Sequence, residues 1–131
     1  LSPGATVMVV GDGAVGLLAA HVAGLFGPAN VVLVGHHDDR LERARAMGAT
    51  LTLNDRAGAD VGALVPDLAH GHGPDAVVDT ISSAESLRSA CEIVRPGGTV
   101  SWVGMEVFLG APQVPWDTTF MRNVTVRGGV C

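Results

Sequence analysis

The fold of this chain is decided by Thr6-Val7-Met8-Val9-Val10-Gly11-Asp12-Gly13-Ala14-Val15-Gly16-Leu17-Leu18-Ala19-Ala20. The stretch begins with an apolar, largely β-branched run, which is typical of a buried strand, and ends with small and apolar residues that favour a helix. Gly-x-Gly-x-x-Gly stands between the two runs. A glycine triplet alone is weak evidence, but one placed between a strand and a helix predicts a dinucleotide-binding βαβ unit.

The three glycines of that motif have different expected roles. Gly11 permits the tight turn out of the strand, Gly13 lets the backbone approach a pyrophosphate, and Gly16 lets the helix pack closely on the strand. The N-terminus of the helix then offers unpaired N–H groups and a partial positive charge to the diphosphate. Asp12 is expected to cap a turn and not to act in catalysis. The competing interpretation is a glycine-rich turn that binds no ligand.

The composition is that of one ordinary globular domain. The chain has 131 residues, of which 47% are hydrophobic and 16% charged, and this is enough to build a single core. The formal net charge of −5 argues against a nucleic-acid partner. No apolar run is long enough to cross a bilayer, and residues 1–4 do not resemble a signal peptide. We therefore expect a cytoplasmic protein without a membrane partner.

The residues that usually carry metal or covalent chemistry are sparse. Cys91 and Cys131 make neither a disulfide framework nor a zinc set, and Cys91 is expected to be a buried apolar residue. His70 and His72 flank a glycine with no cysteine nearby, which favours a solvated loop over a zinc site. All eight basic residues are arginine and tyrosine is absent, which excludes a catalytic Tyr–Lys pair or a Schiff-base lysine. We expect no metal ligand and no catalytic residue in this chain.

Strand and helix signals alternate along the sequence. Strands are expected over 6–10, 31–34, 51–54, 76–79, 99–104 and 124–127. Helices are expected over 15–26, over 38–47 with Asp38 or Asp39 as N-cap, over 83–94 and over 116–121. A further helix is expected over 58–70, but Pro66 breaks its pattern, so it should be short, kinked or late-starting. This alternation predicts an α/β fold, a doubly wound six-stranded parallel sheet of order 3-2-1-4-5-6 with helices on both faces. The sixth strand is an edge, and edges invite pairing, so a homo-oligomer would form through it.

Several further segments point to one family. Met47-Gly48-Ala49 and Arg95-Pro96-Gly97-Gly98-Thr99 are more discriminating than the glycine motif. With these segments and with residues 3–7, 11–16, 40–49, 75–79, 94–100 and 122–129, the chain resembles the coenzyme domain of the medium-chain, zinc-dependent alcohol dehydrogenases. The resemblance covers residues 1–131, which look like a dinucleotide-binding domain cut out of a longer enzyme.

The resemblance implies an oxidoreductase that transfers a hydride between a nicotinamide cofactor and a small alcohol or carbonyl substrate. In the family, zinc and the proton relay belong to a separate catalytic domain that is absent here, so this fragment is expected to bind cofactor without turnover. The resemblance places Thr80 and Ile81 under the adenosine and ribose of the cofactor. It places backbone groups of Val103, Gly104 and Met105 beside the nicotinamide carboxamide.

The end of the second strand bears on cofactor choice. NAD-binding domains usually place an acidic residue there to bind the ribose 2′-OH, whereas this chain has Gly35, followed by His36 and His37. Loss of the carboxylate removes repulsion of a 2′-phosphate, which the imidazoles and Arg40 could bind. Glycine here resembles the NADP-preferring family members, although many of those carry arginine directly after it. NADP is therefore expected, with NAD as the alternative.

The expected cofactor-binding residues are Gly11, Asp12, Gly13, Ala14, Val15, Gly16, Gly35, His36, His37, Arg40, Thr80, Ile81, Val103, Gly104 and Met105.

Two other classes share this kind of fold. A non-catalytic nucleotide-sensing module and an S-adenosylmethionine-dependent methyltransferase both usually carry an acidic residue where Gly35 stands. Sensing modules also usually lack the Arg-Pro-Gly-Gly-Thr turn, and methyltransferases typically end in a β-hairpin. Fold analogy alone does not separate the three classes.

Overall fold

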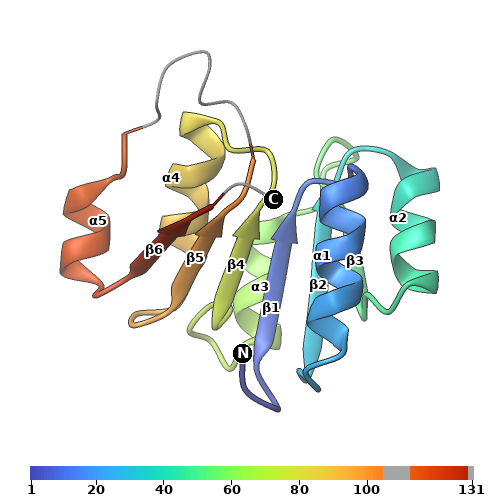
Figure 1. The fold of residues 1–131 in the computed structure, drawn as a ribbon, viewed down its shortest axis with the longest axis horizontal. Helices are drawn as coiled ribbons and strands as arrows, with labels where there is room; N and C mark the ends of the chain where they lie inside the picture. Colours follow the sequence, from blue (N-terminus) through green and yellow to red (C-terminus); the bar gives the residue numbers. More distant parts are fainter. Residues whose placement is uncertain (105–112, 130–131) are drawn as a thin grey trace.

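Six parallel strands form a single sheet in the order β3-β2-β1-β4-β5-β6, as Figure 1 shows. The computed structural model describes residues 1–104 and 113–129. Every pair of neighbouring strands is parallel, so the predicted doubly wound class and strand order are confirmed. The strands are β1 (Thr6–Val10), β2 (Asn30–Gly35), β3 (Leu51–Asn54), β4 (Ala76–Asp79), β5 (Thr99–Trp102) and β6 (Thr125–Gly128).

Each connection between consecutive strands contains a helix. The second helix has a different N-cap from the one predicted, and the third is short and starts late, as expected for the segment around Pro66. The N-cap of the second helix is His37, which makes no side-chain cap hydrogen bond, and Asp38 and Asp39 lie in the first turn, where their charge favours the helix dipole. The third helix begins after Asp60, whose Oδ1 accepts from the Ala63 N–H at 3.0 Å. The helices are α1 (Ala14–Gly24), α2 (Asp38–Ala46), α3 (Val61–Leu68), α4 (Ala84–Ile93) and α5 (Trp116–Met121).

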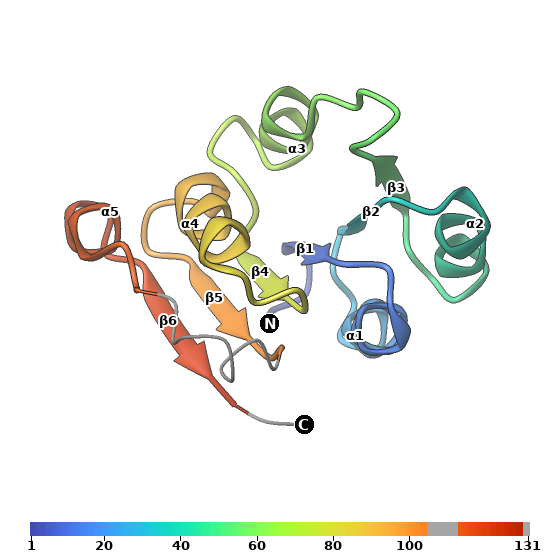
Figure 2. The same cartoon turned by 90° about the horizontal axis from the view of Figure 1, so that it is seen from above.

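The sheet separates two hydrophobic cores, because side chains along a strand alternate between its faces. Val7 and Val9 of β1 pack with residues of α1 and α2, whereas Met8 packs with residues of α3 and α4 on the other face. Figure 2 shows α1 and α2 on one side of the sheet and α3, α4 and α5 on the other. The connections after β1 and β2 run on one face of the sheet, and the later connections run on the other. The neighbouring strands β1 and β4 are therefore followed by helices on opposite faces, and a ligand-binding crevice is expected between the ends of these two strands.

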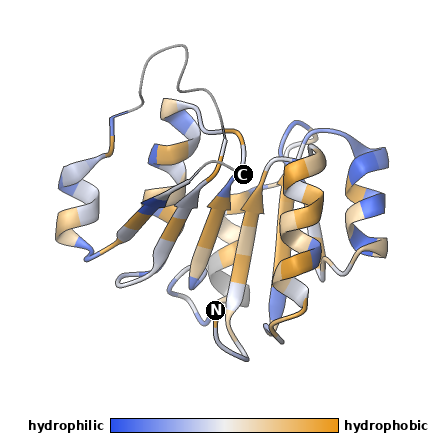
Figure 3. Cartoon of the chain, viewed as in Figure 1, coloured by the Kyte–Doolittle hydropathy of each residue, from blue (hydrophilic) through white to orange (hydrophobic). Residues whose placement is uncertain are grey.

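Helices lie on both faces of the sheet, as predicted, but the described helices cover β4, β5 and β6 on one face only (Figure 2). On the α1 side, no helix within residues 1–104 and 113–129 covers these strands (Figure 2). Side chains such as Val78, Ser101 and Arg127 line an open hollow of about 590 Å³ there. Figure 3 shows that β1 and β2 are more hydrophobic than β5 and β6. The face is open because every crossover after β3 runs on the opposite side of the sheet.

Cys91 is fully buried, as predicted, and burial raises the pKa of its thiol. Trp102 packs partly against the core beneath α4, whereas Trp116 is 73% exposed. Pairing of two copies through the edge strand β6 stays a prediction. None of the helices in the described part of the chain has the length and apolar character needed to cross a bilayer.

Candidate dinucleotide-binding site

A cleft of about 370 Å³ opens where β1, β2 and β4 end. In open parallel sheets, ligands bind outside the carboxyl ends of the strands, at the point where the strand order reverses. That point lies here between β1 and β4. The structure therefore brings together, at the expected place, residues from the ends of separate strands. The predicted residues that line the cleft are Gly11, Asp12, Gly13, Ala14, Val15, Gly16, Gly35, His36, Thr80 and Ile81.

The first and third glycines of the motif are required by close approach. Gly11 has φ +109°, and a Cβ there would lie 2.3 Å from Thr80 Oγ1. A Cβ on Gly16 would lie 1.9 Å from the Gly11 carbonyl oxygen. Thr80 Oγ1 in turn donates to the Val10 carbonyl oxygen at 2.7 Å. Thr80 thus ties the end of β4 to the turn that leaves β1, and α1 packs directly on that turn.

The middle glycine has a different environment. Gly13 is the N-cap of α1 and makes no side-chain cap hydrogen bond. No atom lies within 4 Å of a Cβ built on Gly13. The first N–H groups of a helix lack intrahelical acceptors and attract anions. The open space at Gly13, directly before those N–H groups, therefore fits the diphosphate of a dinucleotide.

The Asp12 side chain connects the glycine-rich loop to the start of α2. Its Oδ2 accepts from the N–H groups of His36 and His37, both at 2.8 Å. The His37 ring Nδ1 lies 3.0 Å from the same oxygen, and Arg40 Nη1 lies 3.5 Å from Oδ1. Burial raises the pKa of Asp12, but the hydrogen bonds from His36 and His37 outweigh it and lower the pKa to about 2. The predicted capping role is confirmed, and the turn that Asp12 caps is the one between β2 and α2.

Gly35 is glycine because Asp12 occupies the space beside it. A Cβ on Gly35 would lie 2.5 Å from Asp12 Cβ and 2.6 Å from Asp12 Oδ2. In the sequence, Gly35 indicates the loss of a carboxylate at the end of β2. In space a carboxylate is present at that position, but it comes from the loop after β1. The residue type at a single position could not reveal this, because the two residues meet only in the folded chain.

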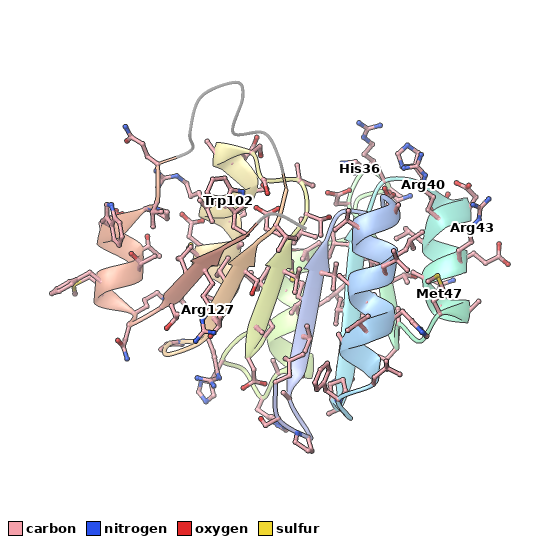
Figure 4. The ribbon with its side chains drawn as sticks, in the orientation of Figure 1. His36, Arg40, Arg43, Met47, Trp102 and Arg127 are labelled. Carbon is pink, nitrogen blue, oxygen red and sulfur yellow. The ribbon has the colours of Figure 1, made fainter. Side chains whose placement is uncertain are left out.

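The remaining predicted residues near α2 have distinct partners. The His36 ring Nδ1 pairs with Asp55 Oδ1, and both residues line the cleft. Asp55 directly follows β3, and it was not among the residues predicted for the site. Its place at the carboxyl end of a parallel strand was the signal that could have identified it. His37 and Arg40 contact Asp12 but do not line the cleft. Figure 4 shows His36 and Arg40 near the N-terminal end of α2, with Arg43 further along the helix.

A buried carboxylate organises the ends of β4 and β5. Asp79 is fully buried and accepts from the N–H groups of Ile81 and Ser82, both at 3.0 Å, and from Ser86 Oγ at 2.8 Å. Ser82, with φ +64°, accepts through Oγ from the Gly104 N–H at 2.6 Å. This network fixes the β4 end against the residues that follow β5, and sequence reasoning missed it.

Val103 and Gly104, the predicted residues after β5 that the structure describes, do not line the cleft. The Val103 N–H donates to the Asp79 carbonyl oxygen at 3.0 Å, and the Gly104 N–H donates to Ser82. Both N–H groups are thus bonded within the chain. Met105 lies outside the described residues.

The side chains that the structure describes form no centre for a metal ion. Across residues 1–104 and 113–129, no group of three or more histidine, cysteine, aspartate or glutamate side chains could hold one. His70 and His72 lie in the connection between α3 and β4. Zinc therefore does not fit the described residues, and no chemical step in this chain is assigned to it.

The comparison with known proteins covers nearly the whole chain. A family model described as zinc-binding dehydrogenase matches residues 14–131. The chain is 34% identical to the NADP-dependent isopropanol dehydrogenase of Thermoanaerobacter brockii, over 98% of this chain and 37% of that protein. It is 35% identical to the NADP-dependent isopropanol dehydrogenase of Clostridium beijerinckii, with the same two coverages of 98% and 37%. The chain belongs to the zinc-binding dehydrogenase family.

The fold comparison agrees with this assignment. The solved alcohol dehydrogenase TADH from Thermus sp. ATN1 matches with a TM-score of 0.88 at 34% identity, over 99% of this chain and 37% of that one. This chain spans about a third of the length of the curated relatives that it matches. The matching part of TADH therefore has the same fold as the domain described here.

Proposed function

We propose that residues 1–131 are the dinucleotide-binding domain of an oxidoreductase that transfers a hydride between a nicotinamide cofactor and a small alcohol or carbonyl substrate. One observation carries the proposal: the open space at Gly13 stands before the N-terminus of α1, inside the cleft at the switch point of the sheet. Membership of the zinc-binding dehydrogenase family supports the reaction class. The names of the two relatives support an alcohol substrate.

The residues of this chain would bind and orient the cofactor. A bound nicotinamide would supply the hydride chemistry itself. The N-terminus of α1 would hold the diphosphate, and Thr80 and Ile81, which line the cleft, would face the adenosine and its ribose. Val103 and Gly104 would stand beyond the cleft, toward the carboxamide. Zinc and substrate would be held by a part of the enzyme outside this sequence, so the domain alone binds cofactor without turning it over.

The cofactor is proposed to be NADP, with NAD also accepted. Donors for a 2′-phosphate gather at the start of α2, where the His36 and His37 N–H groups and the Arg40 guanidinium all reach the same carboxylate. Charge-assisted hydrogen bonds of this kind are the strongest contacts available to a phosphate. The two relatives that are named NADP-dependent favour the same choice.

The test is replacement of Gly13 by valine, followed by calorimetric titration with NADP and with NAD. The added side chain has room in the free chain, since nothing lies within 4 Å of its Cβ, but it fills the space proposed for the diphosphate. Binding of both cofactors should fall by at least about a hundredfold, the scale of losing two or more hydrogen bonds to a charged group.

Gly24→Val is the matched control, because Gly24 lies at the other end of α1 and also has no atom within 4 Å of its Cβ. It should leave both affinities within about twofold, since it is remote from the cleft. Circular dichroism checks that both variants keep the fold. Unchanged cofactor affinity in a folded Gly13→Val chain would place the diphosphate elsewhere and remove the basis of the proposal.

A further inference from the structure

We propose that Asp12 sets the discrimination between NADP and NAD, by placing a carboxylate from the glycine-rich loop in the ribose 2′ subsite at the end of β2. The inference rests on the proposed function, namely that this cleft binds a nicotinamide dinucleotide. It concerns a residue of the phosphate-binding loop, which is ordinarily expected to serve the diphosphate and not the ribose.

The position of the carboxylate follows from the contact between Asp12 and Gly35. In dinucleotide-binding folds the carboxylate that accepts from the ribose 2′-OH projects from the end of β2. In this chain that residue is Gly35, and the Cβ of any side chain there would start 2.5 Å from Asp12 Cβ and 2.6 Å from Oδ2. Asp12 therefore fills the volume from which the usual carboxylate projects. Both residues also line the same cleft.

The donors that could bind a 2′-phosphate are already used by Asp12. Its Oδ2 takes the N–H groups of His36 and His37 at 2.8 Å, and Arg40 reaches its Oδ1 at 3.5 Å. A 2′-phosphate would compete with the carboxylate for these donors and would be repelled by its charge. A free 2′-OH would instead find an acceptor. Asp12 thus lowers the affinity for NADP relative to NAD, and limits the preference that the surrounding donors create.

Asp12 is a stronger determinant than the other acidic residues nearby. Its side chain is 7% exposed, whereas that of Asp55 is 40% exposed and that of Asp39 is 69% exposed. Water screens the charges of exposed groups and weakens their effect on a ligand. Asp55 is also paired with His36, and Asp39 with Arg43. Asp12 remains ionised at neutral pH because its pKa is about 2, so its repulsion of a phosphate is constant across the physiological range.

The experiment measures the dissociation constants of NADP and NAD by calorimetry for the wild-type chain and for Asp12→Asn and Asp12→Ser. Asparagine keeps the size of the side chain and removes its charge, and serine also removes most of its bulk. The ratio of the NAD to the NADP dissociation constant should rise by about tenfold or more in both variants, the scale of one charge-assisted hydrogen bond. Asp39→Asn is the control, since Asp39 lies in the first turn of α2, close in sequence to the donors that bind Asp12, but contacts Arg43 and not Asp12. It should change the ratio by less than about twofold.

A second test uses the wild-type chain alone and compares its affinity for two adenosine phosphates. With Asp12 in place, the 2′-phosphate of adenosine 2′,5′-bisphosphate should raise its affinity over that of adenosine 5′-monophosphate by less than about tenfold. The reason is that the 2′-phosphate has to displace the Asp12 carboxylate from its hydrogen-bond donors. A gain above about a hundredfold in the wild type overturns the inference. The inference is also overturned if the ratio of the NAD to the NADP dissociation constant is unchanged in either Asp12 variant that folds. Failure of the proposed function is distinguishable, because the wild type would then bind neither dinucleotide.

Discussion

Replacing Gly35 by alanine should destabilise the fold, because the new Cβ has no room. That Cβ would lie 2.5 Å from Asp12 Cβ and 2.6 Å from Asp12 Oδ2, whereas carbon atoms in contact stand about 3.5–4.0 Å apart. Asp12 would have to move by about 1 Å. Its hydrogen bonds from the His36 and His37 N–H groups, now 2.8 Å long, would then be stretched beyond hydrogen-bonding range.

The magnitude follows from these two effects. Overpacking a tight site costs about 1–3 kcal/mol, and a hydrogen bond to a charged group contributes about 1.5–3 kcal/mol. The backbone at the exposed start of α2 can shift to relieve part of the overpacking and part of the hydrogen-bond loss, so the two costs are not paid in full. We therefore expect the free energy of unfolding to fall by about 2–3 kcal/mol. Urea unfolding followed by circular dichroism measures it. Gly24→Ala is the control and should be neutral or stabilising by up to about 1 kcal/mol, because its Cβ meets nothing and alanine favours a helix.

A double-mutant cycle with Asp12→Gly tests the cause. Without a Cβ at position 12, an alanine at position 35 has space, so adding Gly35→Ala to Asp12→Gly should cost about 0.5 kcal/mol or less. The two substitutions should therefore show a coupling energy of about 1.5 kcal/mol or more. A cost below about 0.5 kcal/mol for Gly35→Ala in the wild-type background, or additive costs in the cycle, would refute the reasoning.

Two further predictions concern pH and catalysis. Because the pKa of Asp12 in the folded chain is lowered to about 2, below its value of about 3.9 in the unfolded chain, its ionised form stabilises the fold by about 2 kcal/mol above pH 4. This contribution should be lost as the pH falls from about 4 to about 2, and Asp12→Asn should lose less stability than the wild type over that interval in urea unfolding at each pH. If both chains lose stability equally, the Asp12 carboxylate is not held as described. Incubation of the chain with NADP, zinc and a panel of small alcohols should produce no reduced cofactor at 340 nm, and steady turnover would show that a catalytic centre lies within these residues.

The architecture could be predicted from local patterns. Apolar runs such as Val31-Val32-Leu33-Val34, alternating with helical segments, indicated a parallel sheet, because only strands buried on both faces are continuously apolar. The handedness of crossovers then left the observed strand order. The helix boundaries near Asp38 and Asp60 were less certain from sequence, because several polar residues in succession can serve as an N-cap.

Part of the candidate site was also accessible from the sequence. The glycine motif and Thr80 lie in one cleft because carboxyl ends of neighbouring parallel strands share one edge of the sheet. The open face beside β4, β5 and β6 was not anticipated, because strand hydrophobicity reports average burial and not which face a helix covers. Asp55 and the Asp79 network were missed for a related reason, since an acidic residue after a strand has no distinctive pattern.

What the sequence by itself determined is the glycine-rich loop between β1 and α1 and the order of the sheet, because both depend on residue types at short spacing and on the chirality of the chain. What only the tertiary structure decided is which residue places a carboxylate at the end of β2. Asp12 and His36 are 24 positions apart, and nothing in either local segment indicates that the loop aspartate occupies the space beside Gly35. That contact depends on β1 and β2 pairing in a register that sets Val10 opposite Val34. The registry of two neighbouring strands therefore determines which residue supplies the carboxylate at the end of β2.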